Sequence, residues 1–298
     1  MDPNKYLQQV LTSQNLDDTS NELKRIKAHR ESVESLLKEK YGTVPIIRYG
    51  GSKAKGTMNR ESYDLDIICY FPHDSTVAGQ TLESIYNDVC KTLEKKFYVE
   101  RKTSALRLRG KDADSYQVDF HVDVVPGRYV DDKKQDTFLH QENCSKERLK
   151  TNLEVHIDHV KNSGVVSVIR LMKLWRVRNG LRVRQFVLEL LVIKLLQDRK
   201  SDTLSKQLEY LWQEFRDHAD DLAVEDPANP DGNDLSGVVD EARLSLSSVA
   251  SQTLSTLGNS GWEAIFGEAS NLSDDDKRGS LPRLVATVRT PTKPWSQQ

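Results

Sequence analysis

A glycine-rich turn followed closely by two carboxylates two residues apart is the feature that most constrains the fold of this chain. The turn is Gly50-Gly51-Ser52, and Asp64-Leu65-Asp66 follows it after a short spacing. Side chains alternate along a strand, so Asp64 and Asp66 share one face while the apolar residues beside them share the other. Two carboxylates on one face repel each other unless a cation lies between them. Mg²⁺ favours one or two carboxylates together with substrate phosphates.

The turn itself offers groups that complement such a site. The backbone N–H of Gly51 and the hydroxyl of Ser52 can donate hydrogen bonds to phosphate oxygens. A simpler explanation is an ordinary turn followed by two solvated carboxylates, because Asp side chains usually lie at the surface. The short spacing and the apolar residues within 65–71 favour the site over that explanation.

A second strand pattern supplies a third carboxylate. Residues 118–124 alternate between apolar and polar side chains, which places Asp119, His121 and Asp123 on one face. Asp119 and Asp123 are about 13 Å apart along a strand, so only one of them can join the first two carboxylates. We choose Asp123, because Pro126-Gly127 predicts a strand end there, beside a cleft. Asp119 is then a surface residue, and His121 is a neighbour of the site rather than a ligand.

These motifs and three later ones have a familiar order. Gly51-Ser52, Asp64-x-Asp66 and Asp123 in its Val-Asp-Val-Val-Pro context resemble the DNA polymerase β nucleotidyltransferase superfamily. Three segments are similar to the branch that holds the 2′-5′-oligoadenylate synthetases, cyclic GMP-AMP synthase and the bacterial CD-NTases. They resemble a Leu-x-x-Lys-x-Trp helix, a Gln-Tyr-x-Leu-Glu-Leu-Leu helix start and an Asp-Pro-x-x-Pro loop, in residues 168–175, 185–191 and 226–230. The resemblance runs from about residue 45 to about residue 235.

The resemblance implies an α+β fold with two lobes. The first is a polymerase β-like nucleotidyltransferase core, with a mixed sheet and flanking helices. The second is a C-terminal helical lobe, and the active site lies in the cleft between them. We expect the core and a long N-terminal helix in 1–145, the helical lobe in 146–270 and a polar tail in 271–298.

The spacing of apolar residues predicts the elements of this layout. Strands are expected at 46–49, 65–71, 98–102, 105–109 and 117–125. Helices are expected at 18–41 and 82–97, and then, after Pro126, in an almost wholly helical chain at 146–162, 165–179, 185–199, 203–217, 234–256 and near Trp262.

The carboxylates carry the chemistry that the resemblance implies. Asp64, Asp66 and Asp123 are the expected catalytic residues and the ligands of two Mg²⁺ ions, for which Mn²⁺ can substitute. One ion would stabilise the attacking hydroxyl oxygen and the other the pyrophosphate leaving group. Gly51 and Ser52 would bind the β- and γ-phosphates of the nucleotide.

Two residues of the helical lobe are expected at the nucleotide. By resemblance, Lys173 reaches the triphosphate and Gln185 lies near the nucleotide. Lys173 could equally be a solvated lysine on a helix surface, and Gln185 could satisfy backbone donors at a helix start. We interpret Glu189 as a structural charge partner of an arginine. Lys53 and Lys55 either touch phosphate or are ordinary loop charges.

Composition limits the location and partners of the protein. The chain has 298 residues, a net charge of −2 and three cysteines, and it lacks an apolar run long enough to span a membrane. The N-terminus does not resemble a signal peptide, so we expect a reduced cytoplasm and no membrane association. The stretch from Lys161 to Arg184 is basic and has no acidic residue. It is either a solvated face or a surface that attracts triphosphates.

The predicted activity is the synthesis of cyclic or short linear oligonucleotide second messengers from NTPs, ATP among them, in antiviral defence. Regulatory proteins of a defence operon are the expected partners. The chain lacks a zinc insertion and a long basic groove, so no strong nucleic-acid surface is expected. Two alternatives remain open: a template-independent RNA or tRNA nucleotidyltransferase of poly(A) or CCA type, and a catalytically silent nucleotide-binding module.

Overall fold

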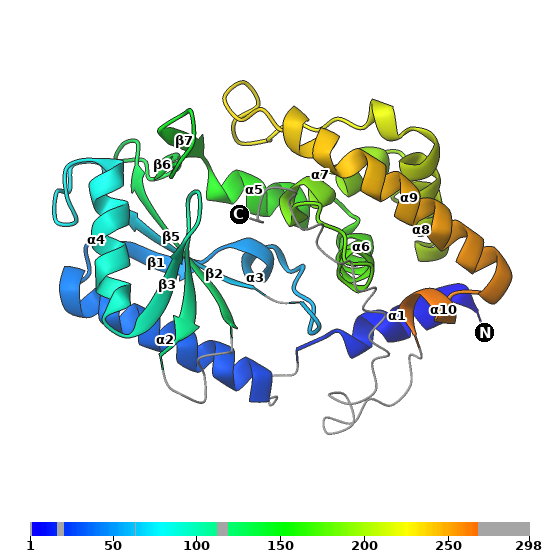
Figure 1. Cartoon of the computed structure of the whole chain (residues 1–298), viewed down its shortest axis with the longest axis horizontal. Coiled ribbons are helices and arrows are strands. Elements are labelled where there is room, and N and C mark those ends of the chain that lie inside the picture. The colour runs from blue at the N-terminus through cyan, green and yellow to red at the C-terminus, as the bar shows by residue number, and fades with distance from the viewer. Residues whose placement is uncertain (1, 17–20, 63, 112–118, 268–298) are drawn as a thin grey trace, which may run out of the picture.

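A mixed sheet forms the centre of the first lobe. The computed structural model describes residues 2–16, 21–62, 64–111 and 119–267, and Figure 1 shows this lobe to one side of a bundle of helices. The strands of the described part are β1 (Ile46–Tyr49), β2 (Leu65–Phe71), β3 (Phe97–Arg101), β4 (Leu106–Gly110), β5 (Asp119–Tyr129), β6 (Thr137–His140) and β7 (Arg148–Thr151). Their order is β1-β2-β5-β4-β3, with β6 on β5 and β7 on β6. Only β2 and β5 pair in parallel among these strands.

Helices complete both lobes. They are α1 (Pro3–Ser13), α2 (Asn21–Tyr41), α3 (Gly51–Lys55), α4 (Leu82–Glu94), α5 (Leu153–Lys161), α6 (Val166–Arg178), α7 (Gln185–Leu195), α8 (Leu204–Asp217), α9 (Ser236–Ser260) and α10 (Glu263–Phe266). A 3₁₀ turn, η1 (Ala219–Asp221), precedes α9. The expected α+β fold, with a mixed sheet and a C-terminal helical region, is confirmed. None of the helices in the described ranges has the length and hydrophobicity needed to cross a membrane.

The alternation of side chains in β2 and β5 gives the sheet two faces, one buried under α2 and α4 and one that carries Asp66 beside a smaller apolar cluster that includes Ile68 and Tyr70. Leu65, Ile67, Val122 and Val124 are buried in one core with residues of α2 and α4. The neighbouring residues of the same strands, Asp66 among them, therefore face away from those helices. This packing fixes the two strands and holds their carboxylates on the side of the sheet nearer the helical lobe.

A separate core fills the helical lobe. Trp175 of α6 and Trp212 of α8 are fully buried there, with ring centroids 6.1 Å apart. Apolar residues of α1 join this core, and the hydroxyl of Tyr6 donates to the carbonyl of Gly267 at 2.5 Å. The first helix of the chain therefore packs on the second lobe, beside α10 (Figure 1).

The prediction of a wholly helical chain after Pro126 is wrong. Strand β5 continues through Pro126-Gly127 to Tyr129, and β6 and β7 follow it. Gly127 permits this arrangement, because a Cβ there would lie only 2.8 Å from side-chain atoms of Leu139 and Thr137 on β6. The helix expected at 146–162 begins only at Leu153.

Boundaries elsewhere agree within a few residues. Helices α6, α7, α8 and α9 fall where the apolar spacing predicts them, and the helix expected at 18–41 is described from Asn21 onward. The turn at Gly50-Gly51-Ser52 opens a short helix, α3, rather than a plain loop. The predicted tail, 271–298, lies outside the described residues.

Candidate active site

The predicted carboxylates converge where β2 meets β5. The parallel register places Asp66 directly beside Asp123, and Asp64 immediately precedes β2. Arg107 of β4 lies opposite Asp123 on the other side of β5. Its Nε and Nη2 atoms donate to Asp123 Oδ1 and Oδ2 at 2.8 and 2.9 Å, and the same Nη2 is 3.5 Å from Asp64 Oδ2. One nitrogen atom thus contacts the carboxylates of both Asp64 and Asp123.

The glycine turn is in direct contact with the third carboxylate. Gly51 adopts a left-handed backbone conformation, with φ of +47°, and an added Cβ would lie 1.6 Å from Asp66 Oδ2. The backbone N–H of Gly50 donates to the carbonyl of Asp66 at 2.8 Å. Ser52 is buried, and its hydroxyl donates a long hydrogen bond, 3.5 Å, to the carbonyl of Asp64. The structure therefore brings all five predicted residues of the core together.

Burial and the neighbouring carboxylates both favour the neutral form of Asp66. Burial raises the pKa of its carboxyl from 3.8 to about 7, and the negative charges of Asp123 and Asp64 contribute to this rise. Lys55 and Lys173 act in the opposite direction. A buried carboxylate beside two others is stabilised by nearby positive charge.

Three carboxylates of this kind fit a hard divalent cation such as Mg²⁺ or Mn²⁺, which prefers oxygen ligands. In the described ranges, no group of three or more His, Cys, Asp or Glu side chains is already arranged to hold a metal ion. Here the guanidinium of Arg107 lies against two of the three carboxylates. The donor set fits the cation, and a positive charge already lies against it.

A buried charge network joins the two lobes next to this site. Lys55 at the end of α3 donates to Glu189 of α7 at 2.7 Å. Thr57 also donates to Glu189, at 3.2 Å. Lys173 of α6 donates to the carbonyl and hydroxyl oxygens of Thr57 at 3.1 and 3.2 Å, and lies 3.6 Å from Glu189. Both Lys173 and Glu189 are buried.

This network bears on two sequence expectations. Lys173 is not a solvated surface lysine, because it is 1% exposed, and burial lowers the pKa of its ammonium group. Its contact with a triphosphate stays a prediction. Glu189 is a structural charge partner as expected, but it pairs with the lysines Lys55 and Lys173 rather than with an arginine.

Gln185 is the first residue of α7 and is partly buried. The ring of Phe186, which follows it, lies 4.9 Å from the ring of His156 and 5.2 Å from Lys55 Nζ. His156 in turn is 2.7 Å from the carboxylate of Asp226, so the Asp-Pro loop is held against α5. The expected role of Gln185 near a nucleotide stays a prediction.

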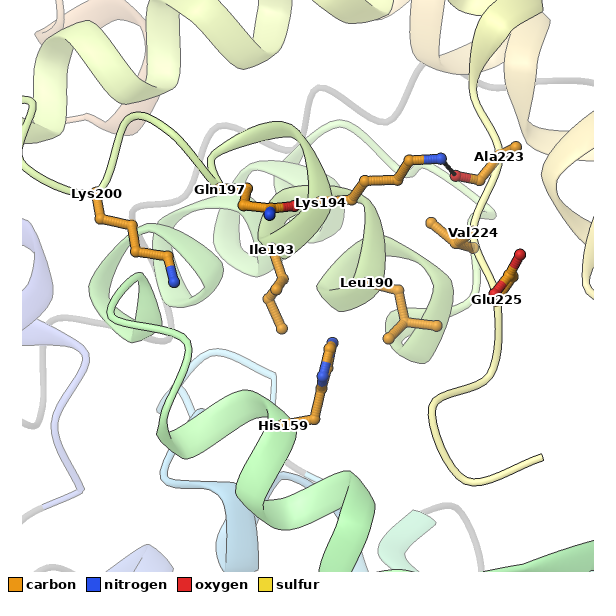
Figure 2. Close-up of a pocket in the computed structure, with 9 residues that line it drawn as sticks. All are labelled: His159, Leu190, Ile193, Lys194, Gln197, Lys200, Ala223, Val224 and Glu225. Carbon is orange, nitrogen blue, oxygen red and sulfur yellow. Dashed lines mark hydrogen bonds between the residues drawn. The ribbon is translucent and has the colours of Figure 1, made fainter. Parts of the chain in front are cut away.

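A cavity of about 520 Å³ lies in the helical lobe, between α5, α7 and the segment 223–225 (Figure 2). Its wall contains His159, one helical turn beyond His156, and Lys194, whose ammonium group donates to the carbonyl of Ala223 at 2.8 Å. Burial lowers the pKa of His159, and the charges of His156 and Lys55 lower it further. None of the predicted site residues lines this cavity.

Sequence reasoning missed Arg107. The alternation of Leu106-Arg107-Leu108-Arg109 could have indicated two arginines on one strand face. Nothing in that pattern shows that β4 pairs with β5, and this pairing is what places Arg107 opposite Asp123.

Comparison with known proteins supports the fold. No protein-family profile and no curated protein sequence matches the chain. Among solved structures, E. coli MS115-1 CdnC in its HORMA-deltaN complex matches with a TM-score of 0.63 and 18% identity over 91% of this chain and 99% of CdnC. The Bradyrhizobium diazoefficiens CD-NTase CdnG, in complex with GTP, matches with a TM-score of 0.65 and 15% identity over 90% and 95%.

The chain has the fold of the bacterial CD-NTases. Vibrio cholerae DncV, described as a cyclic AMP-GMP synthase, shares it with a TM-score of 0.56 and 14% identity over 92% of this chain and 87% of DncV. The predicted fold resemblance is therefore confirmed over nearly the whole chain.

The contact between Gly51 and Asp66 can be tested with two alanine variants. A side chain in the left-handed region costs about 1–2 kcal/mol. Gly51→Ala and Gly56→Ala both incur this cost, because Gly56 has φ of +74°. Only the alanine at 51 must also displace Asp66, since the space around Gly56 is open. Gly51→Ala should lower the free energy of unfolding more than Gly56→Ala in urea titrations, and equal losses would contradict the contact.

The raised pKa of Asp66 predicts a pH dependence in metal-free protein. The folded carboxyl keeps its proton up to about pH 7, whereas the unfolded one loses it near 3.8. The contribution of this carboxyl to the free energy of unfolding is fully present below about pH 3.8 and is lost as the pH rises through about 7. In EDTA, the melting temperature of Asp66→Asn should rise relative to that of the wild type as the pH increases from about 4 to 7. Parallel profiles would show that Asp66 is not perturbed.

The buried network predicts a large effect of Glu189→Gln. Removing one partner of a buried ion pair costs about 3–5 kcal/mol, because the remaining charge is uncompensated. Glu100→Gln is the matched control, since Glu100 pairs with Arg109 at an exposed position and such pairs contribute about 1 kcal/mol or less. Chemical denaturation of both variants checks this. A similar small loss in both would mean that Glu189 does not stabilise the junction of the lobes.

Proposed function

We propose that this protein is a metal-dependent nucleotidyltransferase that makes cyclic or short linear oligonucleotides from NTPs. The observation that carries the proposal is the convergence of Asp64, Asp66 and Asp123 beside Gly51 and Ser52. This convergence occurs in a fold shared with CdnC, solved with ATP, and with DncV, described as a cyclic AMP-GMP synthase.

The three carboxylates would hold the divalent cations of the reaction. Such cations, when bound, lower the pKa of a coordinated hydroxyl and neutralise charge on a triphosphate. Asp123 lies beside Asp66 in register, so it can orient the acceptor hydroxyl and accept its proton. Asp64 and Asp66 lie at the start of β2, on the side of the turn. Together they would set the position of the α-phosphorus of the donor nucleotide.

The turn and the buried lysines would position the triphosphate. The Gly51 backbone reaches the edge of the Asp66 carboxylate, and the Ser52 hydroxyl lies one residue further along α3. Lys55 and Lys173 provide two positive charges near Asp66, and each lowers the pKa of that carboxyl. The electrostatic field of these two lysines favours the binding of an anionic group such as a triphosphate at the site. Gln185, at the start of α7, would border the same nucleotide from the helical lobe.

A regulatory partner is part of the proposal. CdnC was solved in complex with HORMA-deltaN, and it matches this chain over nearly its whole length. We expect a protein partner to bind and regulate this chain as well, in a second-messenger pathway of antiviral defence.

The product of the purified protein tests the function. The protein is incubated with labelled ATP, GTP, CTP and UTP and Mg²⁺, and the products are treated with phosphatase and identified by mass spectrometry. Phosphatase-resistant small oligonucleotides are expected. Extended RNA would instead indicate a template-independent polymerase. An absence of turnover, with nucleotide still bound, would indicate a silent nucleotide-binding module.

Substitution of the carboxylates links the product to the site. Asp64→Asn, Asp66→Asn and Asp123→Asn should each lower product formation by more than about 100-fold, since the loss of residues that merely support metal ligands already costs about 10–100-fold. Asp119→Asn, on the same strand as Asp123, is the control and should retain activity. Initial rates at saturating Mg²⁺ measure this, and the reverse ranking of Asp119 and Asp123 would refute the choice of the third carboxylate.

A further inference from the structure

The guanidinium of Arg107 lies against the proposed catalytic carboxylates. Its Nε and Nη2 atoms both donate to Asp123, and Nη2 also reaches Asp64. The side chains of Arg107 and Asp123 are 23% and 15% exposed, so water screens their attraction only in part. We propose that Arg107 is the counter-ion of the metal-free site, and that it leaves Asp123 for Glu100 when divalent cations bind. The proposal rests on the metal-dependent function proposed above.

Arg107 and a bound cation would both need the carboxylate of Asp123. A bidentate arginine occupies both oxygens of a carboxylate along one edge, and a guanidinium does not lose its charge at any ordinary pH. A divalent cation on the same oxygens would therefore face an adjacent positive charge, which is strongly unfavourable at this separation. Arg107 and a cation at Asp123 therefore compete for that carboxylate, and release of the arginine relieves the repulsion between the two positive charges.

The sheet offers Arg107 a second acceptor in Glu100, whose oxygens also accept from Lys102 at 2.6 Å and from Arg109 at 3.1 Å. Strand β4 lies between β5 and β3, and the register places Arg107 opposite Asp123 on one side and opposite Glu100 on the other. The positive charge of Arg107 already helps to lower the pKa of Glu100, after the larger effects of Lys102 and Arg109. Both acceptors are cross-strand neighbours of one long, flexible side chain. A change of rotamer is enough to exchange one for the other.

The metal-free and metal-bound states of the site differ in their charge balance. Without metal, three carboxylates and one guanidinium leave a smaller net negative charge than the carboxylates alone. With divalent cations bound, the guanidinium is surplus and is repelled toward Glu100. Arg107 thus acts as a positioning residue. It holds Asp64 and Asp123 in place for the cations and lowers the affinity for metal in the absence of nucleotide.

The test measures metal binding directly. The concentration of free Mn²⁺ is measured by electron paramagnetic resonance while Mn²⁺ is titrated into nucleotide-free, full-length protein. Arg107→Gln should bind Mn²⁺ at least about 10-fold more tightly than the wild type, because no resident charge has to be displaced. Arg109→Gln, two residues along the same strand, leaves the contact with Asp123 intact and frees one oxygen of Glu100, so it should bind Mn²⁺ at least as tightly as the wild type but less tightly than Arg107→Gln. Glu100→Gln should weaken Mn²⁺ binding, since it removes the second acceptor.

A second readout separates this role from simple support of the fold. In EDTA, Arg107→Gln should lower the melting temperature more than Arg109→Gln, and saturating Mn²⁺ should remove the difference. Should Arg107→Gln fail to fold, Arg107→Lys replaces it. A lysine keeps the charge but cannot form the two-pronged contact, so it is displaced more easily and Mn²⁺ affinity should rise by a smaller factor.

Mn²⁺ binding by these variants tests the counter-ion role of Arg107 separately from the proposed nucleotidyltransferase activity. Equal or weaker Mn²⁺ binding by the Arg107 variants would overturn the counter-ion proposal while leaving the nucleotidyltransferase proposal intact. A lack of Mn²⁺ binding in every variant, with and without ATP, would overturn both.

Discussion

Repulsion among three carboxylates at two inner strands of the sheet is the constraint on which the rest of this structure depends. Asp66 and Asp123 are neighbours in the parallel pairing of β2 and β5, and Asp64 is held close by the arginine that binds Asp123. The opposite faces of both strands are buried beneath α2 and α4, so the carboxylates cannot separate without exposing that core. Hydrophobic packing thus holds like charges together, and positive charge at the site stabilises them.

The second lobe contributes to the same balance from a distance. Lys55, Thr57, Lys173 and Glu189 form a buried junction in which the positive charges exceed the negative ones. The excess reaches Asp66 as an electrostatic field rather than as a contact. Movement of the lobes relative to each other would change this field. The junction therefore links residues of the helical lobe to the ionisation of Asp66.

The sequence predicts the carboxylates and most elements because each depends on local patterns. Alternation alone places Asp64 with Asp66, and the resemblance supplies the order of the motifs. The strands β6 and β7 escaped prediction because they are short, and β6 depends on Gly127 for close packing. The burial of Lys173 and the role of Arg107 depend on which elements become neighbours. Residue spacing along one strand or helix carries no information about that.

The most direct test of the central claim is a crystal structure of the protein with Mn²⁺ and a non-hydrolysable ATP analogue. Anomalous scattering should place Mn²⁺ within coordination distance of the carboxylates of Asp64, Asp66 and Asp123, with the triphosphate beside Gly51. The guanidinium of Arg107 should no longer contact Asp123. A bound nucleotide with no Mn²⁺ near these carboxylates would contradict the account.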